Sequence, residues 1–320
     1  MSSINTNIAA MTALQSLNQT NKETLVTQNR ISTGFRVNDA SDNAAYWSIA
    51  TTMRADRSSI STVSDALGLG GATVDVAMQG MEGAIKTATA IKDKLLAART
   101  PGLDRVKIQS EITQLQESLR SAVSTAIFSG QNWLAVDSTG ETERTLVSSF
   151  SRDAGGAITV GTITVNLQET MLLDTDASGT TGILDKLRPA ASGGADFRIV
   201  PEDDGSGTPD ADAIDISSFT EDSQANLDRI EDFIKGVDDA IKEMTESATV
   251  LGAVKARVDL QKGFADNLMD AIDTGVGQLV DADMNEESTR LQALQVRSQL
   301  GVQALSMANQ SAQNILRLFQ

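Results

Sequence analysis

The chain has no histidine and no cysteine, and each absence removes a class of chemistry. Without histidine there is no imidazole to serve as a general base, a metal ligand or a pH switch near neutrality. Without cysteine there is no disulfide, no thiol nucleophile and no thiolate metal site. No nucleophile–base pair or phosphate-binding glycine loop stands in their place. We therefore expect a protein that is not an enzyme and that needs no cofactor.

Positive charge and aromatic residues are also scarce. Lysine and arginine number 26 against 43 aspartates and glutamates, which gives a net charge of −17. Nucleic-acid binding needs clustered cations, so this composition argues against it. Aromatic residues make up only 3 % of the chain, so its cores must be built from small aliphatic residues and methionine. That composition suits packed helices better than a large β-sandwich.

Long apolar runs are missing as well. No stretch approaches the roughly 18 apolar residues of a membrane-spanning helix, so we expect no membrane partner. The first residues also lack the basic and apolar segments of a cleaved signal peptide. Taken literally, this predicts a cytoplasmic protein. That expectation fails if export uses a signal that is not removed.

Apolar residues instead recur at spacings of three and four, the period of helices that pack in a coiled coil. The last thirty residues carry one such seam, which includes Leu294, Gly301, Leu305, Ala308, Ala312, Ile315 and Phe319. A matching stripe near the start comprises Ile4, Ile8, Met11, Leu14 and Leu17. Chain ends are usually polar and frayed. We therefore expect the two seams to pair with each other, with other copies, or both, and we predict that these residues form an assembly interface.

The same period predicts the order of helices along the chain. A first helix covers residues 4 to about 33 and closes at Gly34, a residue typical of helix C-termini. A second, roughly 80 Å long at 1.5 Å per residue, ends before Pro101 and Gly102. A third closes near Gly130. Helix resumes near Glu221 and continues to the end of the chain with one break.

Period-two alternation marks the remaining segments. Residues 146–150 and 158–167 alternate around a Gly-Gly turn, which predicts a β-hairpin. Residues 174–221 are rich in Gly, Asp, Thr and Ser and carry two weak strand signals, at 197–200 and 213–216. The predicted fold is mainly α. It is a long coiled-coil helical rod with paired terminal helices, a β-hairpin and a small β- and loop-rich central insertion.

One acidic loop has the spacing of a calcium-binding loop. Asp174, Asp176, Ser178 and Asp185 occupy positions that supply oxygen ligands in such loops. Asp stands where a bidentate Glu is usual, and no clear helix pair flanks the segment. The pattern is therefore weak, and the alternative is a solvated acidic loop without metal.

Motifs near both ends carry a resemblance. The runs 4–8 and 30–45 include Arg-Ile-Ser-Thr-Gly-Phe-Arg-Val-Asn, and the runs 281–283, 299–301 and 308–316 include Ala-Asn-Gln-x-x-Gln-Asn-Ile-Leu. In this order, they resemble the N- and C-terminal signatures of bacterial flagellin, and of its alphaproteobacterial branch in particular. The resemblance covers about 1–170 and 222–320.

This resemblance implies a function and partners. The subunit would be exported unfolded through the flagellar type III apparatus, with its signal in the uncleaved N-terminal region. It would polymerise outside the cell into the filament that drives swimming, alone or with other flagellins. An export chaperone, the filament cap and hook-junction proteins would be its further partners.

The resemblance also implies a division by role. Residues 1–36 and 288–320 would form a terminal coiled-coil domain in the inner tube. Residues 37–174 and 222–287 would form the helical rod and hairpin of the outer tube, and 175–221 a small variable domain facing solvent. The alternative is a hook–filament junction protein of the same superfamily, which usually departs from the Asn-Gln-x-x-Gln-Asn ending kept here at 309–314. Flagellins with a metalloprotease insert need a His-Glu-x-x-His helix, which the lack of histidine excludes.

Overall fold

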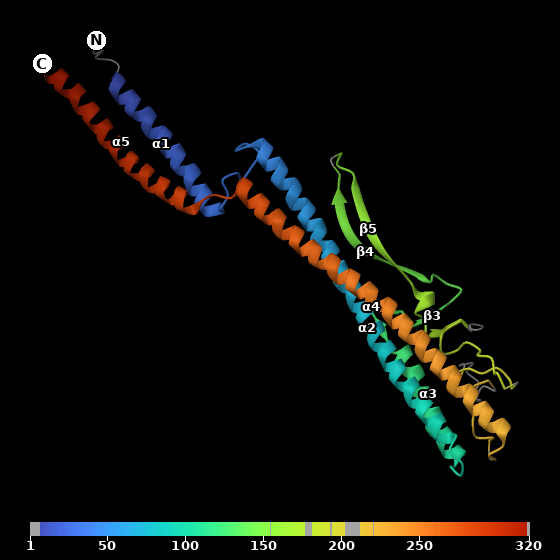
Figure 1. Cartoon of the computed structure of the whole chain (residues 1–320). Coiled ribbons are helices and arrows are strands. Elements are labelled where there is room, and N and C mark those ends of the chain that lie inside the picture. Colours follow the sequence, from blue (N-terminus) through green and yellow to red (C-terminus); the bar gives the residue numbers. More distant parts are fainter. Residues whose placement is uncertain are drawn as a thin grey trace. The chain divides into compact units, whose positions relative to one another are not determined.

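The computed structural model describes residues 7–153, 155–176, 181–192, 194–201, 212–219 and 221–318, with side chains as far as residue 310. The chain divides into two compact units (Figure 1). Unit 1 comprises Met1–Ser58 and Leu268–Gln320, and unit 2 comprises Ser59–Asn267. Two long helices, α2 (Ala44–Ala98) and α4 (Gln224–Val280), contribute residues to both units. The predicted fold, mainly α with long helices and a hairpin, is confirmed.

Unit 1 is built on a pair of terminal helices, α1 (Ile8–Thr33) and α5 (Met284–Leu318), which lie side by side (Figure 1). The Asn7 side chain caps α1 by accepting a hydrogen bond from the Ala10 N–H at 3.0 Å. Gly34 ends the helix with a φ of 76°, and its N–H bonds to the Arg30 carbonyl. The left-handed conformation favours glycine, so the predicted closure at this residue is confirmed.

A short junction joins this pair to the parts of α2 and α4 that belong to unit 1. The Val280 carbonyl accepts the N–H groups of Arg36 and Val37, at 2.7 and 3.2 Å. Four buried apolar side chains form a small core here: Val37, Ala50, Val276 and Val280. The Asp283 carboxylate caps the start of α5 by accepting the N–H groups of Asn285 and Glu286. Backbone pairing and capping thus fix the turn between the helices.

Unit 2 packs α2, α3 (Arg105–Ser124) and α4 around one core. The α2 helix ends at Ala98, before Pro101 and Gly102 as predicted. The expected end of the third helix near Gly130 is wrong, because α3 ends at Ser124. Ser129 and Gly130 have φ values of 50° and 78°, and they form the turn between strands β1 (Ile127–Phe128) and β2 (Gln131–Asn132). Two residues with positive φ suit a tight hairpin turn and not a helix.

The predicted hairpin is present as strands β4 (Glu143–Arg152) and β5 (Ile158–Asn166). They pair antiparallel, with a register shift between Val147 and Ser149. A short 3-10 turn, η1 (Leu167–Glu169), follows, and β6 (Leu173–Asp174) then pairs parallel with β3 (Ala135–Val136). Ile163 and Val165 of β5 point inward and are buried, which attaches the hairpin to the helical core.

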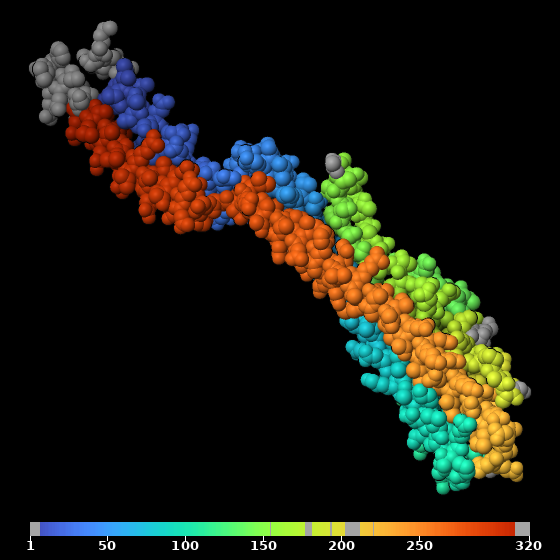
Figure 2. Space-filling model, viewed as in Figure 1, coloured from blue at the N-terminus to red at the C-terminus, as the bar shows by residue number. Residues whose placement is uncertain are grey.

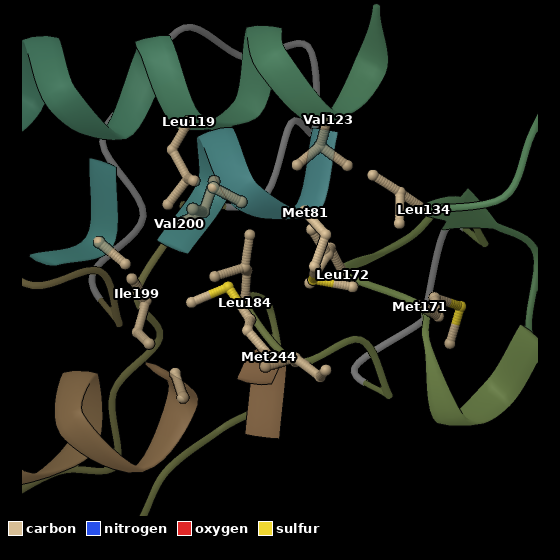
Figure 3. Packing of buried hydrophobic residues seen from close by; sticks show 14 of the residues in the cluster. Met81, Leu119, Val123, Leu134, Met171, Leu172, Leu184, Ile199, Val200 and Met244 are labelled. Carbon is tan, nitrogen blue, oxygen red and sulfur yellow. The ribbon is translucent and has the colours of Figure 1, made fainter. Parts of the chain in front are cut away.

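The core of unit 2 draws on every element around it. Met81 comes from α2, Leu119 and Val123 from α3, and Met244 from α4 (Figure 3). Residues of the central insertion complete the cluster. They are buried apolar side chains at Ile183, Leu184, Phe197, Ile199, Val200, Ile214 and Ile216. The two weak strand signals form only isolated bridges, Arg188–Phe197 and Arg198–Ala213. The described part of the insertion therefore has an inward side that the sequence pattern did not reveal.

Candidate assembly surface

The face of α5 that contacts α1 follows the predicted seam. Leu294 is buried, and Gly301, Leu305 and Ala308 are half-buried. A Cβ added at Gly301 would lie 3.3 Å from Cδ1 of Leu17, so this residue marks a close approach of the two helices. At the far end of the described pair, Nδ2 of Asn7 donates to the Ala308 carbonyl at 3.0 Å. Figure 2 shows the two helices packed along each other.

On α1 the contacting face differs from the apolar stripe in the sequence. Leu17 faces α5, but Ile8, Met11 and Leu14 are 65 %, 63 % and 48 % exposed. The covered residues instead follow a regular three-four spacing through small and polar side chains, namely Ala10, Ala13, Leu17, Thr20, Thr24 and Thr27. A search for apolar residues misses such a seam. The regular spacing of alanine and threonine was the signal that could have found it.

Two threonines of this seam, Thr20 and Thr24, satisfy their hydroxyl groups within the helix. Oγ1 of Thr20 donates to the Ser16 carbonyl at 2.9 Å, four residues earlier in the same helix. A hydroxyl bonded in this way can be buried at little cost. The seam therefore allows close approach but buries few large apolar groups.

The outer faces of the pair remain apolar. Besides the three side chains of α1, large exposed apolar residues lie at Leu25, Val26, Val296, Leu300, Val302 and Met307. Exposed apolar side chains on both helices form a surface that is typical of protein–protein contacts. The predicted interface residues Ile4 and Phe319 lie outside the described residues, as do the side chains of Ala312 and Ile315.

A partly buried ion pair ties the two helices together near the junction. Nη1 of Arg30 lies 3.0 Å from Oε1 of Glu287, whose side chain is almost fully buried. Arg290 approaches the same carboxylate oxygen at 3.7 Å. Polar groups buried in this way favour one register of a helix pair, because any other register leaves a charge without its partner.

The acidic loop that resembled a calcium site uses its carboxylates for hydrogen bonds to the protein. Asp174 accepts the N–H groups of Ser138 and Asp176, each at 3.1 Å, and the Thr181 hydroxyl. Asp185 in turn accepts the Asp174 N–H at 2.6 Å. Ser178 lies outside the described residues. Within the described ranges, no group of three Asp or Glu side chains is placed to hold a metal ion.

The surroundings of Asp174 and Asp185 shift the pKa values of the two carboxyls in opposite directions. Asp185 is only 5 % exposed, and one of its carboxylate oxygens has no hydrogen-bond partner among the described residues. Desolvation and the neighbouring Asp174 carboxylate raise the pKa of Asp185 to about 6, against the Asp174 N–H and Arg198, which lower it. Desolvation also raises the pKa of Asp174, but its hydrogen bonds outweigh that effect and hold the pKa below its usual value of 3.8.

Arg105 is a structural residue that the sequence analysis did not single out. Its nearly buried guanidinium donates from Nε to the Ala98 carbonyl and from Nη1 to the carbonyls of Phe219 and Glu221, at 3.0, 2.8 and 3.0 Å. It also pairs with Asp222. One side chain thus links the end of α2, the start of α3 and the segment before α4.

The fold and its exposed surfaces define a class of protein before any comparison. Long helices, two chain ends paired along a close seam and apolar outer faces are the features of a structural subunit that associates with copies of itself. Among the described residues, no helix is long and apolar enough to cross a membrane.

Comparison with known proteins identifies the family. Residues 4–139 match the bacterial flagellin N-terminal helical region, and residues 234–319 match the bacterial flagellin C-terminal helical region. Flagellin C of Rhizobium meliloti (strain 1021) is 47 % identical over 329 residues, and flagellin A of the same strain is 40 % identical over 396. The flagellin of Brucella melitensis biotype 1 is 41 % identical over 321 residues. Each alignment covers all of both chains.

The chain belongs to the flagellin family, as the terminal motifs suggested. Flagellins are structural proteins that polymerise into the filament of the bacterial flagellum, outside the cell. The predicted function of a flagellar filament subunit is thereby confirmed at this level.

Proposed function

We propose that this flagellin is exported unfolded through the flagellar type III apparatus and then polymerises through the outer faces of α1 and α5. The observation that carries the assembly part of the proposal is the contrast between the two sides of this helix pair, while the export route follows from the resemblance to flagellins. Apart from Leu17, the α1 side of the inner seam is mostly small or polar, whereas Ile8, Met11 and Leu14 are exposed on the outside. These side chains gain a buried environment only from other copies.

The magnitude supports assembly through this surface. Burying one large aliphatic side chain contributes about 1.5–3 kcal/mol. Met11, Leu300 and Met307 are each more than half exposed, so several such contributions are available to every copy. A lattice repeats the contact along its length, and small contributions at each copy then decide whether the polymer forms.

In this proposal the three parts of the chain keep the roles implied by the resemblance. Residues 1–36 and 288–320 form the inner tube, 37–174 and 222–287 the outer tube, and 175–221 lie at the filament surface. The export signal lies in the uncleaved N-terminal region. An export chaperone, the filament cap and the hook-junction proteins are the partners of this route.

A matched pair of variants tests the surface. Met11→Glu places a charge on the outer face of α1, and Ser16→Glu places the same charge at an exposed polar position about 140° around the helix from Met11. We expect the Met11 variant to fail to elongate sonicated filament seeds and the Ser16 variant to elongate them like the parent chain. Equal elongation by both variants, measured by sedimentation, would remove this face from the interface.

Electron microscopy of the parent chain separates the two members of the superfamily. Long helical filaments are expected of a filament subunit. Short annuli, or a chain that stays monomeric with seeds present, would favour a hook–filament junction protein instead.

A further inference from the structure

Charge is divided unevenly within unit 1. The terminal helix pair, 8–33 and 284–318, is net positive although the whole chain is strongly acidic. It carries Lys22, Arg30, Arg290, Arg297 and Arg317 against Glu23, Glu286 and Glu287. The remainder of unit 1, which we call the acidic junction (34–58 and 268–283), has the opposite balance. It carries Asp39, Asp42, Asp56, Asp270, Asp273, Asp281 and Asp283 against Arg36, Arg54 and Arg57.

The positive charges of the helix pair gather at one place. An open groove of about 590 Å³ runs between α1 and α5. Four cationic side chains line it, Lys22, Arg30, Arg290 and Arg297, against one acidic side chain, Glu23. Val26 and Leu294 contribute apolar surface. We call this feature the cationic groove. Arg30 and Arg290 approach the buried Glu287, and Arg297 approaches Glu23 at 3.6 Å.

We propose that the cationic groove binds the acidic junction of a second copy of this chain, so that neighbouring helix pairs stack head to tail. The inference rests on the proposed function, because it names the contact that orders copies in the polymer. A groove on one surface that binds a different surface of the next copy is a heterologous contact, and such contacts generate open filaments. Charge complementarity of this kind sets register and direction more than affinity.

A contact between Asp281 and Arg297 requires the second copy. Asp281 precedes α5, and Arg297 lies sixteen residues further along the chain on that helix. At 1.5 Å per residue the separation is roughly 24 Å, so Asp281 cannot reach Arg297 of its own chain, although Arg30 and Arg290 lie at the end of the groove nearer the junction. A second copy displaced by roughly this distance along the helix pair brings the two opposite charges together.

The available side chains favour this arrangement. Lys22 and Arg297 are exposed at the groove, and Asp270 and Asp281 are exposed at the junction. Asp39, Asp42 and Asp283 accept backbone N–H groups of their own turns and so are held in place there. Asp270 and Asp281 are therefore the junction acids whose charge can be reversed with least effect on the local fold.

Charge reversal and its rescue test the contact. The variant Lys22→Glu/Arg297→Glu reverses the groove, and Asp270→Lys/Asp281→Lys reverses the junction. We expect each pair alone to slow elongation from filament seeds by about tenfold or more, because like charges then face each other between copies. The four changes in one chain restore elongation to within about threefold of the parent, since the complementary charges are exchanged. Circular dichroism of each monomer reports its helicity.

A matched control separates specific contact from net charge. Glu117→Lys/Glu246→Lys changes the total charge by the same amount as the junction reversal, but at exposed positions of unit 2. Combined with the groove reversal, it is expected not to restore elongation. Rescue by this control pair, or normal elongation by the reversed groove alone, would overturn the inference. A folding defect at the groove would not be rescued by the distant junction changes. Failure of the parent chain to elongate seeds would instead count against the proposed function.

Discussion

Replacing Asp185 by asparagine isolates the effect of a buried charge in unit 2. The carboxyl is 5 % exposed, and Asp174 and Arg198 are the charged groups that face it. Its pKa rises from 3.8 to about 6 in the folded chain, mainly through desolvation. Because each pKa unit corresponds to about 1.4 kcal/mol, ionisation of this group opposes folding by about 3 kcal/mol above pH 7. Asparagine keeps the shape and removes the charge.

The pH window follows from the direction of this shift. Well below pH 3.8 the carboxyl is neutral in both the folded and the unfolded chain, so the parent and Asp185→Asn should be equally stable. As pH rises toward 6, the unfolded chain ionises and the folded chain does not, so the parent loses stability. Above pH 7 the variant should exceed the parent by up to about 3 kcal/mol in its free energy of unfolding.

Tryptophan fluorescence provides the assay. The chain has two tryptophans, and Trp133 is buried in the core of unit 2. In a Trp47→Phe background, urea unfolding followed at Trp133 reports unit 2 alone. Asp174→Asn is the control of opposite sign, because the lowered pKa of Asp174 means that its ionised form stabilises the fold near neutral pH. If Asp185→Asn were less stable than the parent at pH 8, the assignment of an unfavourable buried charge would be refuted.

Three further predictions concern the helix pair and the link between helices. The α1–α5 seam buries few large side chains, while ordering the backbone costs about 1–2 kcal/mol per residue. We therefore expect these helices to form fully only on polymerisation, so circular dichroism should show more helix in the filament than in the monomer. Equal helicity in monomer and filament would contradict this. Gly301→Leu should overpack against Leu17 and destabilise the α1–α5 helix pair by about 1–3 kcal/mol. The control, Val302→Leu, changes an exposed side chain and should not. Normal filaments from the Gly301 variant would show that α1 and α5 do not approach closely there. Arg105→Ala should lower the free energy of unfolding of unit 2 by about 3–5 kcal/mol. Lys107→Ala, at an exposed position, should leave it unchanged in the same urea titration. A loss below about 1 kcal/mol for the Arg105 variant would mean that water replaces the hydrogen bonds of the guanidinium.

The insertion shows where sequence reasoning about this fold stopped. The resemblance implied that residues 175–221 form a variable domain facing solvent, and they lie outside every heptad seam. Phe197, Ile199 and Ile216 are nonetheless fully or almost fully buried against α3 and α4. Gln116 of α3 donates to the Ile199 carbonyl at 2.7 Å, which further anchors the segment. Replacement of the whole segment by a short linker would therefore uncover part of the core. A segment without periodicity can still supply core residues, because long-range packing decides its inward side.

The sequence by itself determined the long helices and two of their ends, but not the end of α3 at Ser124. Gly34 and the Pro101–Gly102 pair end helices through backbone conformation, which depends only on neighbouring residues. The α5 seam was equally readable, since its period is a local property of the chain. The terminal motifs indicated the family because they too are runs of neighbouring residues that can be read from the sequence.

Only the tertiary structure decided which face of α1 meets its partner. The apolar stripe at Ile8, Met11 and Leu14 pointed to one face, but the covered face is another, on which Leu17 approaches Gly301. It also decided that Arg105 joins three segments and that Asp174 and Asp185 titrate in opposite directions. Each outcome depends on distances between residues far apart in the chain or on burial by other elements. Composition and periodicity carry no information about either, because burial and contact are properties of the folded chain.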